Sequence, residues 1–128
     1  MKVIKISQMV LRAAFVLALI LGLCFWANLI QPTQAFRGIH MLLGILVVLS
    51  LWIIGLAQGT TKGGNFVLAL VTFAVGLAVA IVGMWQDSWR ASINITLLNT
   101  IHLLLGLIAV GLGEMIAGRT KRLAKAQA

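Results

Sequence analysis

Four long runs of apolar residues divide this 128-residue chain, and they restrict its fold more than any other feature. The runs cover about residues 10–30, 39–57, 66–85 and 97–117. Each is close to the roughly 20 residues that a helix needs to cross a ~30 Å hydrocarbon layer. None shows the alternating polarity of the strands in a membrane barrel. We therefore predict an all-α integral membrane protein in which residues 1–128 form one domain, a four-helix bundle.

Composition and charge support a membrane protein. Only 9% of the residues are charged, against about 25% in soluble domains. Lysine and arginine concentrate near both termini and after the second apolar run, as is typical of cytoplasmic segments. We therefore expect cytoplasmic termini in a bacterial or archaeal cell membrane, where anionic lipid accounts for the net charge of +8. The basic tail lacks the aromatic residues and reading motifs of nucleic-acid binders, so no nucleic-acid partner is expected.

Polar segments separate the apolar runs. The first contains the single proline, Pro32, and the second, "GTTKGG", is expected to form a tight hairpin. In the third, Asp87 or Ser88 is expected to cap a helix that continues directly into the fourth run. The first run is longer than the apolar part of a signal peptide, so we expect it to be a retained helix.

Two phrases occur twice in the chain and indicate an internal repeat. "FVLAL" covers residues 15–19 and 66–70, and "IHMLLG" at 39–44 is matched by "IHLLLG" at 101–106. Each half contains two spans, so both halves enter the membrane from the same side. Parallel repeats of this kind are related by a two-fold axis along the membrane normal. We therefore expect two parallel two-helix repeats in which His40 and His102, the only histidines, face each other at the same depth.

A histidine pair inside a membrane bundle is a candidate ligand set. An imidazole in hydrocarbon is costly and is by default a functional candidate; the alternative is a structural histidine bonded to a carbonyl group or lying in the interface. Zinc requires four ligands, and the only acids, Asp87 and Glu114, are poorly placed to supply them. Haem iron needs only two axial ligands from the protein. We predict that His40 and His102 are the metal ligands of one haem.

Three further residues fit such a site. Gly44 and Gly106 lie four positions after the histidines, on the same helical face, where a side chain would strike a porphyrin. The alternative is that they only allow close helix packing. Arg37 lies one turn before His40, where it or Arg90 would bind a haem propionate; the alternative is an arginine that lies at the lipid headgroups. No "CxxCH" attachment motif occurs, so the haem would be b-type and non-covalent.

The four-helix plan and the "IHMLLG"/"IHLLLG" pair resemble the four-helix membrane cytochrome b group, which includes bacterial superoxide oxidase and related quinone-linked cytochromes. The resemblance implies haem bound by histidines on transmembrane helices and electron exchange with quinone. Members usually hold two haems with four histidines, whereas this chain has two histidines. The resemblance therefore implies one bis-histidine haem b per chain, near the outer face.

The leading expectation is a single-haem b-type cytochrome that transfers one electron at a time near the outer membrane face. Its partner would be quinone or a redox protein, within or outside a larger membrane complex. The sequence does not indicate whether the protein is also an enzyme that turns over a substrate. One alternative is a cofactor-free accessory subunit of a larger membrane complex. Another is a small transporter that uses Glu114, the only acid within an apolar run.

Overall fold

A computed structural model describes all 128 residues and contains four helices and no strands. They are α1 (Lys2–Trp26), α2 (Gln34–Gly59), α3 (Phe66–Trp89) and α4 (Ile95–Ala126). All four are long and apolar enough to cross a membrane. The predicted all-α membrane bundle is therefore confirmed.

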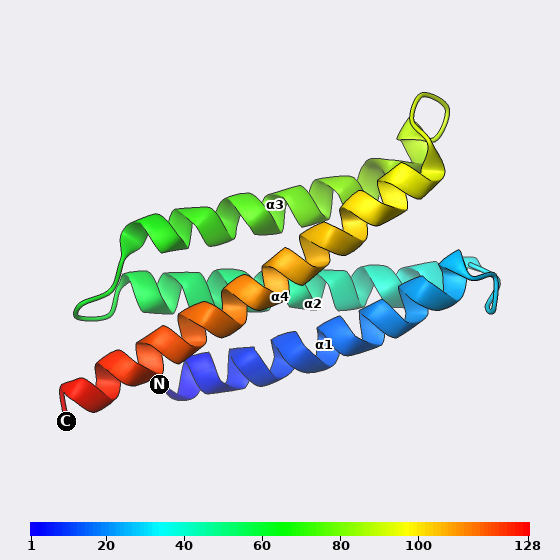
Figure 1. The fold of residues 1–128 in the computed structure, drawn as a ribbon. Helices are drawn as coiled ribbons and strands as arrows, with labels where there is room; N and C mark the ends of the chain where they lie inside the picture. The colour runs from blue at the N-terminus through cyan, green and yellow to red at the C-terminus, as the bar shows by residue number, and fades with distance from the viewer.

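Consecutive helices run antiparallel (Figure 1). Both termini and the α2–α3 loop lie at one end of the bundle, here called the terminal end. The α1–α2 and α3–α4 loops lie at the opposite end, here called the far end. Helix α2 packs against α1, α3 and α4, and α4 also packs against α1 and α3, whereas α1 and α3 do not touch. The cross-section is thus a rhombus, with α2 and α4 on its short diagonal.

Two predicted boundaries are wrong for local reasons. Helix α1 ends at Trp26 rather than at Ile30, because the backbone N–H groups of Leu29 and Ile30 both donate to the carbonyl oxygen of Cys24. Asn28, immediately before Leu29, has a positive φ of 56°, which an asparagine tolerates. These bonds give the Cys24 carbonyl group, near the end of the helix, its hydrogen-bond partners and turn the chain toward α2.

The fourth helix does not begin at Asp87 or Ser88, because α3 continues through both of them. Asn94 is the N-cap of α4 instead: its side-chain oxygen accepts hydrogen bonds from the N–H groups of Thr96 and Leu97, at 2.8 and 3.3 Å. Such a cap supplies partners for helix N–H groups that have none within the helix. The tight "GTTKGG" hairpin is confirmed, with Gly63 at a φ of 78°.

The bundle is closely packed in its terminal half. Leu11, Leu51, Ile54 and Ile116 are fully buried there. Most other large apolar side chains are exposed on the outside of the bundle, as lipid-facing residues are. Toward the far end the core clusters thin out, and a cavity takes their place.

Candidate cofactor site

All four helices line a cavity of about 820 Å³ in the far half of the bundle. Its walls are mostly apolar, and examples from the four helices in order are Phe15, Val48, Val79 and Leu103. A volume of this size with a few polar groups is typical of cofactor pockets. Because α1 and α3 do not touch, the space between them is available to the cavity.

The two histidines project into this cavity from α2 and α4. Six residues of α2 precede His40 and seven of α4 precede His102, so both lie about two turns from the far end. Their ring centres are 6.1 Å apart and the ring planes are inclined at 60°. The expectation that they face each other at the same depth is therefore confirmed.

One nitrogen of each imidazole is buried without a hydrogen bond. This atom is Nδ1 in both His40 and His102. Nε2 of neither ring is hydrogen-bonded or buried in this way, so it borders the cavity. Unpaired polar atoms in an apolar interior are costly. A structural role is therefore less well supported for His102 than for His40, whose ring lies close to the Ala18 carbonyl group.

The separation of the rings fits one metal ion between them. Two imidazoles on opposite sides of one ion have ring centres about 6.2 Å apart, since each metal–nitrogen bond is about 2.0 Å and each ring centre lies about 1.1 Å behind its nitrogen. The observed separation is 6.1 Å. No group of three or more histidine, cysteine or acidic residues exists that would complete a metal site from protein ligands alone. The donor set thus suits a metal whose other ligands come from a cofactor.

Gly44 and Gly106 both line the cavity. A Cβ atom at Gly44 would meet nothing within 4 Å, and one at Gly106 would meet only Phe15, at 3.4 Å. Close packing against a neighbouring helix therefore does not explain Gly44. Both glycines keep space open one turn below the histidines.

Two other glycines, which were not among the predicted site residues, lie against the imidazoles, so that an added side chain would press on the rings. A Cβ atom at Gly22 of α1 would lie 3.1 Å from Cε1 of His40, and one at Gly83 of α3 would lie 3.0 Å from Cε1 of His102. The two pairs are separated by 18 and 19 residues in the sequence. This near-constant spacing is their only trace in the sequence, and by itself it does not show that they face the histidines.

The "FVLAL" phrase does not mark equivalent positions. Phe66 is the first residue of α3 and is 62% exposed, whereas thirteen residues of α1 precede Phe15, which lines the cavity. A short apolar phrase matches easily by chance in helices of this composition. Gly22 of α1 and Gly83 of α3 are alike in that each lies against the histidine of the next helix.

Arg37 and Arg90 both lie at the far-end edge of the cavity, and one carboxylate joins them. Asp87 accepts from Arg37 Nη1 at 3.1 Å and from Arg90 Nε at 2.8 Å. The Arg37 Nε group also donates to the carbonyl oxygen of Pro32 at 2.9 Å. The three charged groups sum to one positive charge, which leaves the cavity edge attractive to a carboxylate.

Glu114 lies in the terminal half, away from the cavity, and is fully paired. It accepts from Arg12 Nε and Nη2 at 2.6 and 2.7 Å and from Gln8 Nε2 at 2.7 Å. Gln8 Oε1 in turn accepts from Lys121 at 2.6 Å. This network connects α1 to α4, so Glu114 has a structural role in the observed conformation.

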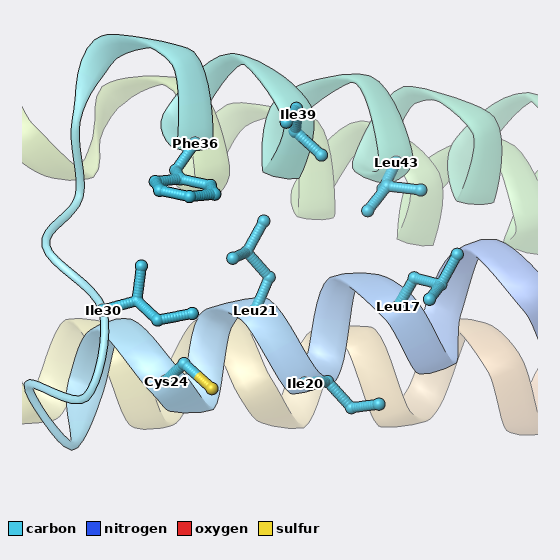
Figure 2. Close-up of a pocket in the computed structure, with 8 residues that line it drawn as sticks. All are labelled: Leu17, Ile20, Leu21, Cys24, Ile30, Phe36, Ile39 and Leu43. Atoms are coloured by element: carbon cyan, nitrogen blue, oxygen red, sulfur yellow. The ribbon is translucent and has the colours of Figure 1, made fainter.

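A second, smaller hollow of about 300 Å³ opens between α1 and α2 (Figure 2). Phe36, Ile39 and Leu43 of α2 face Leu17 and Leu21 of α1 across it. All eight lining residues are apolar, with the Cys24 thiol the most polar group. The hollow offers no donor set for a cofactor and suits hydrocarbon.

No family model, curated protein or solved structure matches the chain. The geometry of the cavity is therefore the basis for the function proposed below.

Proposed function

We propose that the chain is a single-haem membrane b-type cytochrome in which His40 and His102 are the axial ligands. The observation that carries the proposal is the pair of facing imidazoles, with ring centres 6.1 Å apart, on opposite walls of a mostly apolar cavity. Two half-buried histidines on facing helices, each with an unpaired Nδ1, are the whole protein contribution that a b-type haem requires.

The similar surroundings of the two histidines support the proposal that the chain consists of two parallel repeats. Each imidazole has its Cε1 atom closest to a glycine of the preceding helix, at distances that differ by 0.1 Å for a Cβ placed there. A two-fold axis between α2 and α4 would produce this pairing and would place the iron on the axis.

The bound haem would supply a one-electron redox centre. Around it, the chain's own residues hold the two imidazoles and exclude water. Gly44 and Gly106 leave room for the porphyrin plane, and the guanidinium groups of Arg37 and Arg90 would hold its carboxylates at the far end. Asp87 would then share its two arginines with those carboxylates.

The distribution of charge supports an outward-facing site. Eight lysines and arginines lie in segments at the terminal end and two at the far end, so we propose that the termini are cytoplasmic. The histidines then lie near the outer leaflet. Electron exchange would take place there, with quinone or with a partner redox protein, alone or within a larger membrane complex.

An absorption spectrum tests the proposal. Protein expressed with haem available should show a six-coordinate low-spin spectrum that changes on reduction with dithionite. His40→Ala and His102→Ala should each abolish that spectrum, and added imidazole should restore it in part by occupying the vacated space. The matched control is Thr100→Ala, since Thr100 lies on α4 outside the cavity and bonds only to the Thr96 carbonyl. A colourless wild-type protein would rule out the proposal and favour the accessory subunit.

A further inference from the structure

Gly22 and Gly83 are unusual among the helical glycines in what lies nearest to them. For each, the three closest atoms to an added Cβ all belong to one imidazole, in the order Cε1, Nδ1, Nε2. The distances are 3.1, 3.7 and 3.9 Å at Gly22 and 3.0, 3.7 and 3.8 Å at Gly83. The Cε1 corner of each ring therefore points at a glycine.

Each of these glycines makes room for a side chain of the next helix. Glycine lowers helix propensity, and in membrane helices it is usually accepted where another helix approaches closely. That is the situation at Gly55, where an added Cβ would meet Thr72 of the neighbouring helix. Gly76 is a close parallel, since an added Cβ there would meet the ring of Trp52. At Gly22 and Gly83 the neighbouring ring is a histidine that lines the cavity, so each glycine limits where that ring can sit.

We propose that Gly22 and Gly83 are positioning residues, each of which holds the imidazole of the next helix at a fixed rotation. The inference rests on the proposed haem site for its functional meaning. A ring held at its Cε1 corner cannot turn toward α1 or α3, which keeps Nε2 toward the cavity. The two contacts together maintain the inclination of 60° between the ring planes.

This inclination has a spectroscopic consequence. In a bis-imidazole ferric haem, the angle between the two ligand planes governs the anisotropy of the low-spin electron paramagnetic resonance signal, and widely inclined planes give strongly anisotropic signals. Groups that orient the two imidazoles therefore influence the electronic properties of the haem iron. Gly22→Ala or Gly83→Ala should push one ring by a few tenths of an ångström and shift the largest g value.

Haem-free protein provides the first test, a double-mutant cycle on the midpoint of thermal unfolding. In the wild-type background and in His102→Ala, Gly22→Ala should raise the midpoint less than Gly38→Ala or Gly111→Ala does, because the new Cβ displaces the ring. In His40→Ala, where the ring is absent, this difference should disappear. Gly83→Ala should show the reverse dependence. Gly38→Ala and Gly111→Ala are the matched controls, because a Cβ at either position meets nothing within 4 Å.

Haem-loaded protein provides the second test. The g values should shift, or six-coordinate haem be lost, in Gly22→Ala and Gly83→Ala and in neither control. Equal coupling of Gly22 to both histidines, absence of any coupling, or unchanged g values would overturn the inference. A wild-type protein that binds no haem would overturn the proposed function, while the cycle on haem-free protein would still decide whether the glycines position the rings.

Discussion

Replacing Gly44 with leucine should stabilise the haem-free protein and prevent it from binding haem. The Cβ of residue 44 points into open space, with no atom within 4 Å, and the position lines the cavity one turn below His40. A leucine there would fill the part of the cavity that the porphyrin needs. It would leave both histidines and the helix contacts unchanged.

The gain in stability follows from the removal of a helical glycine. Helix propensity contributes about 0.5–1 kcal/mol, and contacts of the new side chain with the cavity wall raise the total to about 1–2 kcal/mol. For a chain of this size each 1 kcal/mol shifts the unfolding midpoint by roughly 2–8 °C. The midpoint of the haem-free Gly44→Leu variant should therefore rise by several degrees.

The assay combines thermal unfolding of detergent-solubilised, haem-free protein with a haem titration followed at the Soret band. Gly111→Leu is the control, since Gly111 is exposed on the outside of α4 and its Cβ would meet nothing. That variant should bind haem as the wild type does. Haem uptake by Gly44→Leu at wild-type stoichiometry and affinity would refute the assignment of this cavity to haem, and a lower midpoint would show that the space is not open.

Three other predictions concern charge and orientation. Glu114→Gln should lower the unfolding midpoint by about 2–8 °C, the effect of one net hydrogen bond, because the carboxylate accepts three bonds from Arg12 and Gln8; an unchanged midpoint would show that the network does not stabilise the α1–α4 contact. Asp87→Asn should tighten haem binding about two- to five-fold at low salt by freeing the two arginines that it joins, and titrations at high salt should show no difference. In oriented vesicles, a membrane-impermeant reductant should reduce the haem from the far-end side; reduction only from the side of the C-terminal tail would contradict the outward-facing site.

Hydropathy and segment length are enough to predict the class of the protein and the number of its helices. Apolar runs of about 20 residues have few stable arrangements in lipid, since every backbone polar group must be bonded within the segment. The repeated histidine phrase also predicted that His40 and His102 meet, as their ring separation of 6.1 Å confirms. These conclusions depend on length, polarity and repetition, which are properties of the chain alone.

Local hydrogen bonds decided the helix ends, and polarity alone predicted them poorly. Asn94 and the Cys24 carbonyl each satisfy groups that a hydropathy pattern does not show. Asp87 looked like a helix cap from its position before the fourth apolar run. It lies instead within α3 and joins two arginines at the cavity edge.

Only the tertiary structure revealed the cavity and what surrounds the rings. Gly22 and Gly83 are two of the 13 glycines in the chain, and nothing in the sequence of their own helices distinguishes them from the others. Their role depends on how α1 and α3 are rotated about their axes and how closely they approach α2 and α4. Helix α1 is held by the cluster around Leu11 and Ile116, and α3 by the cluster that contains Val79, each of which joins several helices. Contacts between distant segments of this kind leave no periodic pattern in the sequence, so the positions facing the histidines emerge only when the helices are packed together.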